Sequence, residues 1–200
     1  MCRFIETVRV ENGQICNADY HLQRIHTTRN YHWGDAPTFS WKEIESAIDV
    51  SVPQAKLRFI YDRKYVSEVT FTPYVTPQIR SLQLAEVFHA DYSFKRVDRT
   101  LFQQLKLQYP TCDDVLIVCQ GKITDTSFTN VAFFDGQRWL TPDTPLLAGT
   151  RRASLLAEGR IHEHPIGVAD LVKYSHVALF NAMNDLGDIV LPIECIHGRL

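Results

Sequence analysis

YSFKRVDRTLFQQLKLQYPTCDDVLIVCQGKITDTSFTNVAFF, residues 92–134, contains three kinds of chemical group on which the interpretation of this chain depends. A lysine, Lys95, lies between an aromatic side chain and an arginine. Further along, a strand–turn–strand pattern carries one acid, Asp125, within a run of threonine and serine hydroxyls. A lysine that forms a Schiff base, an acid that pairs with a pyridinium nitrogen, and donors for a phosphate are the groups that hold pyridoxal phosphate. The stretch therefore predicts a site for this cofactor.

The overall composition is that of an ordinary globular protein. The chain has 200 residues, of which 45% are hydrophobic and 22% are charged. Its net charge of −2 gives no electrostatic reason to expect nucleic acid or a membrane surface as a partner. No apolar run approaches the roughly 18 residues that a membrane span needs, and the first residues show no signal-peptide core. Five cysteines without C-x-x-C spacing predict reduced thiols and a cytoplasmic location.

The order of helix-like and strand-like segments predicts the fold class. The two kinds of segment are mixed without a regular strand–helix–strand alternation, so we expect an α+β fold with largely antiparallel sheets and flanking helices. The composition changes near residues 90–97. We therefore expect two small domains: an N-terminal α/β domain over residues 1–91, and a domain over residues 92–200 that carries the lysine and most of the cofactor site.

Hydrophobic periodicity and turn residues predict the individual elements. Asn12 and Gly13 form a hairpin signal, and Ser40 with Glu43 is typical of a capping box at the start of a helix. The expected helices span residues 20–31, 41–50, 99–107 and 149–159, and the expected strands span residues 4–10, 14–16, 56–62, 65–74, 81–88, 114–119, 123–124, 130–134, 138–141, 177–181 and 189–193.

Several motifs occur in an order that is more specific than any one of them. They are FIETVR with a following NG (residues 4–9 and 12–13), HLQRI (21–25), SFKRVDR (93–99), GKITDTSFTNV (121–131) and LAGTRR (147–152). In this order they resemble the fold-type IV pyridoxal-phosphate enzymes, the class-IV aminotransferase superfamily. The resemblance is greatest to the short form represented by aminodeoxychorismate lyase, and it implies the D-amino-acid aminotransferase-like architecture.

The resemblance also implies a role for each matched residue. Lys95 corresponds to the Schiff-base lysine and is the implied catalytic residue. Arg24 corresponds to an arginine that reaches the cofactor phosphate, and Asp125 to the acid that pairs with the pyridinium nitrogen. The other implied cofactor-binding residues are Thr129, Asn130, Gly149, Thr150, Arg151, Asn181 and Ala182.

Most of these residues have an ordinary structural alternative. Lys106 is a rival for Lys95, although a lysine on an amphipathic helix commonly extends along the surface. Asp125 could cap a turn, Arg24 could lie on a solvated helix face, and Gly149 could belong to a simple turn. We expect no metal site, because the sequence around His162-Glu163-His164 is that of a surface connection.

The sequence departs from the family pattern in three places. It begins at the early strand, where the family usually has a glycine-rich segment that helps to shape the substrate pocket. Asp125 replaces the usual glutamate, and Arg151 replaces a threonine in the phosphate loop. These departures concern the substrate and the phosphate contacts.

The resemblance implies a small-molecule amine substrate and a homodimer. SFKRVDR and the segment Asn181-Ala182-Met183 resemble the lyase branch. The expected activity is therefore that of a 4-amino-4-deoxychorismate lyase, which eliminates pyruvate to give 4-aminobenzoate for folate synthesis by way of a Schiff base and proton transfer by Lys95. Two alternatives stay open: a class-IV aminotransferase acting on branched-chain or D-amino acids, and a degenerate protein that binds pyridoxal phosphate without turnover.

Overall fold

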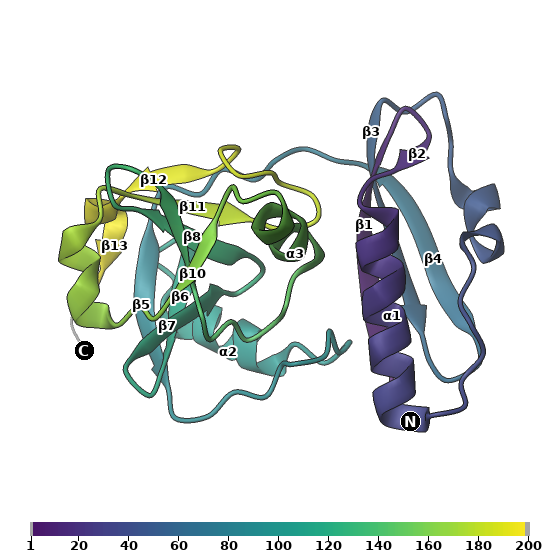
Figure 1. The fold of residues 1–200 in the computed structure, drawn as a ribbon, viewed down its shortest axis with the longest axis horizontal. Coiled ribbons are helices and arrows are strands. Elements are labelled where there is room, and N and C mark those ends of the chain that lie inside the picture. Colours follow the sequence, from purple (N-terminus) through teal and green to yellow (C-terminus); the bar gives the residue numbers. More distant parts are fainter. Residues whose placement is uncertain (1, 199–200) are drawn as a thin grey trace. The chain divides into compact units, whose positions relative to one another are not determined.

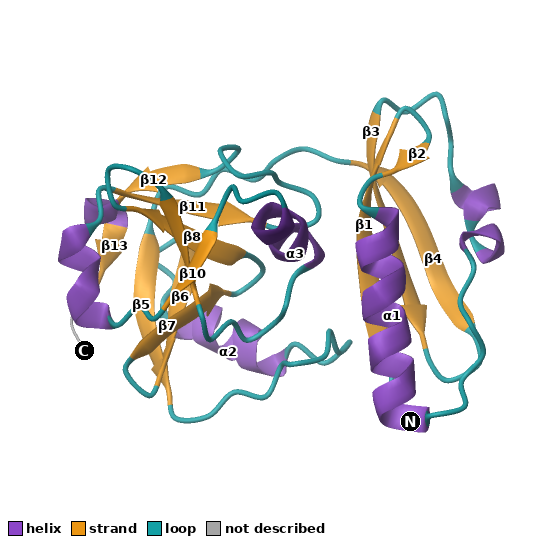
Figure 2. Cartoon of the chain, in the orientation of Figure 1, coloured by secondary structure: helices purple, strands orange, loops and turns teal. Residues whose placement is uncertain are grey.

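The computed structural model describes residues 2–198, and the chain forms two compact units (Figure 1). Unit 1 contains the chain up to Thr76 together with Phe94–Asp98, and unit 2 contains Pro77–Ser93 and the chain from Arg99 onward. Each unit combines helices with sheets that are mostly antiparallel (Figure 2), which confirms the expected α+β class. Among the described residues, none of the helices has the length and apolar character needed to cross a membrane.

The two units do not coincide with the ranges 1–91 and 92–200. The segment around Lys95 lies beside the first strand: the backbone N–H of Ile5 donates to the carbonyl of Lys95 at 2.9 Å, and Phe4 forms an antiparallel bridge with Arg96. These backbone contacts attach Phe94–Asp98 to unit 1. The strand Leu82–Val87, in contrast, pairs with Asp114–Cys119 in unit 2.

Unit 1 is an antiparallel sheet with one long helix against it (Figure 1). Its strand order is β2-β1-β3-β4. The side chains of Phe4, Val8 and Val10 pack with Ile25 of the helix in one buried cluster, because alternate residues of a strand point to the same face of a sheet. The elements are β1 (Phe4–Glu11), β2 (Gln14–Ile15), α1 (Ala18–Trp33), β3 (Gln54–Tyr61) and β4 (Val66–Pro73).

The expected helix over residues 41–50 is wrong. The chain forms two short 3₁₀ turns there, Trp41–Glu43 and Glu45–Ala47. The capping box of Ser40 and Glu43 is present, but Ile44 has φ −132° and ψ 0°, so the backbone leaves the helical path after a single turn.

Unit 2 contains two sheets. One has the order β10-β9-β8-β11-β12, and the other has the order β13-β5-β6-β7. Most pairs are antiparallel, whereas β5 pairs in parallel with β6 and β13, and β9 in parallel with β10. The elements are β5 (Leu82–Val87), α2 (Thr100–Gln108), β6 (Asp114–Cys119), β7 (Lys122–Thr126), β8 (Asn130–Phe134), β9 (Trp139–Pro142), α3 (Thr150–Ala157), β10 (His162–His164), η3 (Val168–Lys173), β11 (His176–Phe180), β12 (Val190–Pro192), η4 (Ile193–Cys195) and β13 (Ile196–His197).

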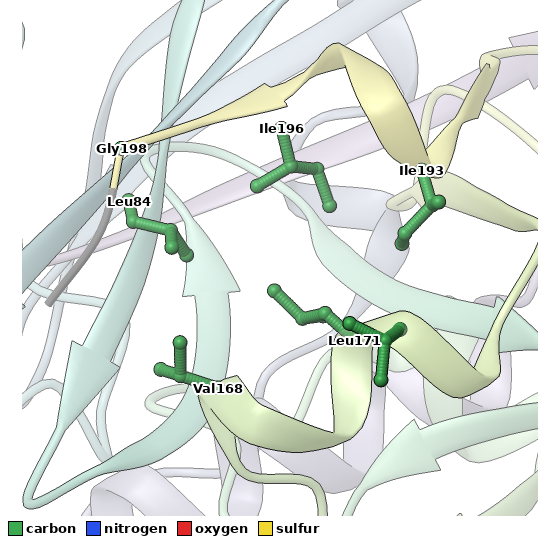
Figure 3. Close-up of a pocket in the computed structure, with 7 residues that line it drawn as sticks. Leu84, Val168, Leu171, Ile193, Ile196 and Gly198 are labelled. Carbon is green, nitrogen blue, oxygen red and sulfur yellow. The ribbon is translucent and has the colours of Figure 1, made fainter.

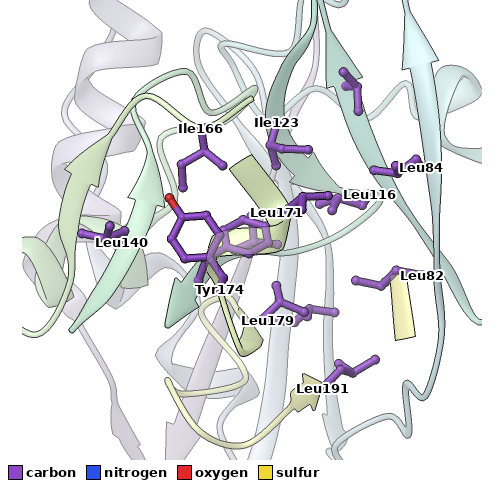
Figure 4. Packing of buried hydrophobic residues seen from close by; sticks show 14 of the residues in the cluster. Leu82, Leu84, Leu116, Ile123, Leu140, Ile166, Leu171, Tyr174, Leu179 and Leu191 are labelled. Atoms are coloured by element: carbon purple, nitrogen blue, oxygen red, sulfur yellow. The ribbon is translucent and has the colours of Figure 1, made fainter. Parts of the chain in front are cut away.

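The main core of unit 2 is formed by side chains from both of its sheets (Figure 4). Leu116 of β6 and Leu179 of β11 are fully buried within it, together with Leu82 of β5. Burial of one such leucine contributes about 1.5–3 kcal/mol. The continuous apolar run of β6, which the sequence predicted as a strand, thus contributes to this core. The predicted helices at 99–107 and 149–159 are confirmed as α2 and α3.

Candidate functional site

The hydroxyl-rich run forms a tight turn between β7 and β8. The backbone N–H of Thr126 donates to the carbonyl of Thr129 at 2.9 Å, and the two threonine hydroxyls lie 2.7 Å apart. The hydroxyl oxygen of Thr126 also accepts from the N–H groups of Phe128 and Thr129 (3.3 and 3.1 Å). The hydroxyls that the sequence singled out thus hold the turn itself in shape.

Asp125, just before this turn, is buried and accepts two hydrogen bonds. Its side chain is only 5% exposed. Oδ1 accepts from the amide of Asn130 at 2.8 Å, and Oδ2 accepts from the backbone N–H of Leu147 at 2.9 Å. Burial raises the pKa of Asp125 to about 6, although these hydrogen bonds and the charge of Arg152 act in the opposite direction. Asp125 is therefore an acid that changes charge close to neutral pH.

Asn130 connects the acid to the loop that precedes α3. Its amide nitrogen also donates to the carbonyl of Leu147 at 2.9 Å. A Cβ atom on Gly149 would lie 2.0 Å from the amide oxygen of Asn130, so only glycine lets the loop approach this closely. Gly149 is the residue before the first turn of α3, where backbone N–H groups have no partner within the helix and favour an anion. Gly149 thus allows the close contact between this loop and Asn130, and its role toward a phosphate stays a prediction.

The two arginines that follow Gly149 point their side chains at acidic partners. Arg151 donates to Asp185 through Nε and Nη2 (2.9 and 2.6 Å). Arg152 is buried and donates to Glu163 at 2.7 Å, and its Nε is a buried donor without a hydrogen-bond partner among residues 2–198. Arg151 therefore directs its guanidinium to Asp185, and what it can offer an anion in this loop is its backbone N–H.

Asn181 ties the turn after β11 to the hydroxyl-rich turn. Its amide nitrogen donates to the carbonyl of Phe128 at 3.1 Å, while its amide oxygen accepts from the backbone N–H groups of Met183 and Asn184 (2.8 and 3.1 Å). Hydrogen bonds therefore join Asp125, Asn130 and the loop before α3, and link Asn181 to the adjoining turn. The other predicted residues of this unit, Thr129, Thr150, Arg151 and Ala182, lie in these same segments.

A second polar cluster lies in unit 1, between β1 and α1. Glu6 is fully buried. Arg24 donates two hydrogen bonds to it, from Nε to Oε1 (2.9 Å) and from Nη2 to Oε2 (2.6 Å). The ring nitrogen Nδ1 of His21 donates to Oε2 at 2.7 Å. Burial alone would raise the pKa of Glu6, but Arg24 and His21 together lower it to about 2. Burial lowers the pKa of His21.

Sequence reasoning identified Arg24 in this cluster but missed Glu6 and His21. A usable signal was present, because residues three apart lie on one side of a helix, as His21 and Arg24 do. Glu6 alternates with Phe4 and Val8 on the strand face that is otherwise apolar, and a buried acid requires a partner.

Lys95 belongs to the same unit as Arg24. It is half-buried, and its positive charge contributes to the lowered pKa of His21, which places the two side chains within electrostatic range. Its neighbour Phe94 packs on Tyr31 of α1, with ring centroids 4.6 Å apart. The rival Lys106 lies in unit 2, with Nζ 4.0 Å from Asp114 and a side chain that is 47% exposed. The ion pair with Asp114 accounts for the presence of Lys106 on α2 without a role in the cofactor site.

Two further features of unit 2 do not suit the cofactor or a metal ion. An open groove of about 410 Å³ is lined by aliphatic side chains and one glycine (Figure 3), so none of its lining residues has a side-chain donor for a phosphate. The strand His162–His164 is exposed, and its Glu163 forms an ion pair with Arg152. Within the described part of the chain, no group of three or more His, Cys, Asp or Glu side chains could hold a metal ion.

Comparison with known proteins shows the family. The amino-transferase class IV family matches residues 3–190. An uncharacterised protein of Haemophilus influenzae is 33% identical over 190 residues, which cover 93% of this chain and 100% of that protein. The crystal structure of a proposed 4-amino-4-deoxychorismate lyase from Haemophilus somnus has a TM-score of 0.85 at 34% identity, covering 93% of this chain and 98% of the other.

A proposed amino-acid aminotransferase from Mesorhizobium loti shares the fold, with a TM-score of 0.85 at 23% identity and coverage of 98% and 100%. The family match extends over all the motifs from Phe4 to Arg152 and includes both polar clusters. The chain therefore belongs to the class-IV aminotransferase family and is a pyridoxal-phosphate enzyme of the lyase or aminotransferase type.

Proposed function

We propose that this enzyme is a 4-amino-4-deoxychorismate lyase, which converts its substrate into 4-aminobenzoate and pyruvate. The observation that carries the proposal is the likeness, over almost the whole length of both chains, to the Haemophilus somnus protein that bears this name. The motifs SFKRVDR and Asn181-Ala182-Met183, which resemble the lyase branch, support the same activity. The alternatives are an aminotransferase acting on branched-chain or D-amino acids, and a protein that binds the cofactor without turnover.

The residues of both clusters suit pyridoxal phosphate. The start of α3 after Gly149, with the backbone N–H groups of Thr150 and Arg151, suits a phosphate. Arg24, whose guanidinium is held in one orientation by Glu6, is proposed as a phosphate ligand on the strength of the family resemblance. Asp125 is the proposed partner of the pyridinium nitrogen. When bound, the cofactor supplies an electron sink for the carbon atom next to the substrate amine.

Lys95 is the proposed proton carrier. In the lyase reaction a base removes the proton from the ring carbon that bears the amino group, and the enolpyruvyl oxygen leaves from the adjacent carbon as the ring becomes aromatic. A proton delivered to the methylene carbon of the departing group completes pyruvate, so protons and electrons balance. A single amine can do both steps, because the proton that it takes from the ring is the one that it returns.

The direct test is product analysis with purified enzyme, pyridoxal phosphate and 4-amino-4-deoxychorismate. We expect 4-aminobenzoate, followed by its fluorescence, and pyruvate in equal amounts. If the enzyme instead transfers the amino group of D- or branched-chain amino acids to a 2-oxo acid and forms no 4-aminobenzoate, the aminotransferase alternative is correct. Cofactor binding without either reaction would favour the non-catalytic alternative.

The raised pKa of Asp125 gives an expected pH dependence for cofactor binding. A carboxyl with a folded pKa of about 6 is mostly ionised at pH 7.5 and mostly protonated at pH 5. Because only the ionised form pairs favourably with a protonated pyridine nitrogen, we expect the affinity of the apoenzyme to fall by up to roughly tenfold per pH unit below pH 6. The measurement is an absorbance titration of apoenzyme with pyridoxal phosphate between pH 5 and 8.

The control for this experiment is Asp125→Asn, which removes the titrating carboxyl. The phosphate of the free cofactor also titrates near pH 6, and this variant retains that effect. The difference between the two pH profiles therefore reports Asp125 alone. Identical slopes for wild type and variant would show that Asp125 does not face the cofactor ring.

The proposal includes a cytoplasmic homodimer. All five cysteines are free thiols in the structure, which suits a reducing compartment. The homodimer rests on the family resemblance.

A further inference from the structure

The side chain of Arg151 ties the first turn of α3 to a turn that is distant in the sequence. Nε and Nη2 of Arg151 both donate to one oxygen of Asp185, Oδ1, at 2.9 and 2.6 Å. Nη1 donates to the hydroxyl of Ser154 at 2.9 Å, and that hydroxyl donates to the carbonyl of Arg151 at 3.0 Å. Because a guanidinium is planar and rigid, these partners fix the direction of the Arg151 side chain.

Asp185 is itself held in place within the turn between β11 and β12. Its Oδ1 also accepts from the backbone N–H of Leu186 at 2.6 Å, and its own N–H donates to Oδ2 of Asp188 at 2.7 Å. Burial would raise the pKa of Asp185, but the hydrogen bonds from Arg151 and Leu186 lower it below its ordinary value. Asp185 is therefore a charged acceptor in a fixed position.

The first turn of α3 gains from such an anchor because the helix is short. It has eight residues, Thr150–Ala157, and no side-chain hydrogen bond caps its start at Gly149. Helices of this length are marginal by themselves, and their ends fray. Two more charges extend the anchor: Glu158 lies 3.3 Å from Nη1 of Arg151, and Arg160 lies 3.6 Å from Oδ1 of Asp185. This ionic network thus supports a helix start that lacks a cap.

We propose that Asp185 is a positioning residue for the cofactor phosphate. Through Arg151 it holds the first turn of α3, so that the N–H groups of Thr150 and Arg151 keep the direction in which they meet the phosphate. The inference rests on the proposed function in taking the start of α3 as the phosphate site. Asp185 acts only through Arg151, so its removal affects the binding of the phosphate and not that of the cofactor ring.

The test compares pyridoxal phosphate with pyridoxal, which has the same ring and aldehyde but no phosphate. Both dissociation constants are measured by absorbance titration of the apoenzymes of wild type, Asp185→Ala and Asp185→Asn. In Asp185→Ala we expect about tenfold weaker binding of pyridoxal phosphate, the lower end of the range for a charge-assisted hydrogen bond, and no more than about a twofold change for pyridoxal. Asp185→Asn retains an acceptor oxygen and should show a smaller loss.

A double-mutant cycle tests the route through Arg151. Arg151→Gln removes the guanidinium but keeps the backbone N–H, so its loss should equal that of Asp185→Ala. Because both variants break the same interaction, the double variant should bind pyridoxal phosphate no more weakly than either single variant. Additive losses would show that Asp185 does not act through Arg151. A loss in Arg151→Gln alone would show that the guanidinium contacts the phosphate itself, and either result overturns the proposal.

The matched control is Asp135→Ala, which removes another aspartate from a turn of unit 2. Asp135 accepts from the backbone N–H groups of Gln137 and Arg138 (2.8 and 2.9 Å) and lies 3.7 Å from the Arg138 guanidinium. It should leave both dissociation constants unchanged. Melting temperatures identify a misfolded variant, and Asp185→Asn provides the test if Asp185→Ala is unstable. Equal losses for pyridoxal phosphate and pyridoxal, or no loss for either, overturn the proposal.

Two further results distinguish this inference from the proposed function. Thr150→Pro removes one proposed phosphate donor, because proline has no N–H and is tolerated at the first position of a helix. If Thr150→Pro weakens the binding of pyridoxal phosphate but Asp185→Ala does not, the phosphate site stands and the role of Asp185 fails. If Asp185→Ala has the expected effect but the wild type forms no 4-aminobenzoate, the role of Asp185 stands and the lyase assignment fails.

Discussion

Replacement of Lys95 by alanine is expected to remove the covalent attachment of the cofactor and to lower kcat by at least about 10²–10⁴-fold, the range for loss of a positioned acid–base group. The reason is that Lys95 is the proposed carrier of the substrate proton as well as the residue that holds the cofactor. The measurement is an absorbance spectrum of the enzyme with pyridoxal phosphate, followed by borohydride reduction and mapping of the modified peptide.

The control for Lys95→Ala is Lys106→Ala. Lys106 forms an ion pair with Asp114 in unit 2, so its removal should leave the absorbance of the bound cofactor and the position of the reduced adduct unchanged. A reduced adduct found on Lys106 in the wild type, or an unaltered spectrum in Lys95→Ala, would contradict the site. In either case the interpretation of residues 92–134 would have to be revised.

Arg24→Ala is expected to lower the free energy of unfolding by about 3–5 kcal/mol at pH 7, because it leaves the charge of Glu6 buried without its main partner. The depression of the Glu6 pKa from 4.5 to about 2 corresponds to a similar stabilisation of about 3 kcal/mol. The measurement is urea denaturation of the apoenzyme, in which cofactor binding plays no part.

The pH dependence of this effect has a definite sign. The folded pKa of Glu6 is depressed, so its contribution is fully present above pH 4.5 and is lost as the pH falls toward 2. In Arg24→Ala the pKa of Glu6 rises, and a proton neutralises the buried charge. The difference in stability between wild type and variant should therefore be smaller at pH 3 than at pH 7.

Arg63→Ala is the matched control for Arg24→Ala. Arg63 also forms an ion pair in unit 1, with Asp35, but the two side chains are 42% and 71% exposed. An exposed pair of this kind contributes about 0–1 kcal/mol. An equal loss of unfolding free energy in both variants would show that the buried pair of Glu6 and Arg24 contributes no more than an exposed ion pair.

Local sequence patterns were sufficient for the hydroxyl-rich turn and the strands on either side of it. The apolar run of β6, the turn around Gly121 and the start of β8 are each encoded within a few residues, so periodicity and turn propensity are informative there. The same reasoning failed at residues 41–50. The capping box was identified correctly, but a start signal does not show that the next turns will remain helical, and the backbone changes direction at Ile44.

The predicted roles of two residues depend on contacts that no local pattern contains. Arg151 was predicted as a cofactor-binding residue at the start of a helix, and folding adds a contact of its guanidinium with Asp185, which is 34 residues away in the sequence. Glu6 was predicted only as part of an alternating strand, although it forms hydrogen bonds with Arg24 and His21 in the buried space between β1 and α1. In both cases the partner is brought close by folding.

The α+β class, most of the elements and the individual family motifs could be predicted from the sequence, because each depends on residues close together in the chain. Contacts between segments far apart in the chain bring the Lys95 segment beside β1 in unit 1 and pair Glu6 with Arg24. The physical reason is that strand register and the pairing of buried charges depend on segments far apart in sequence, which a local hydrophobic period does not specify.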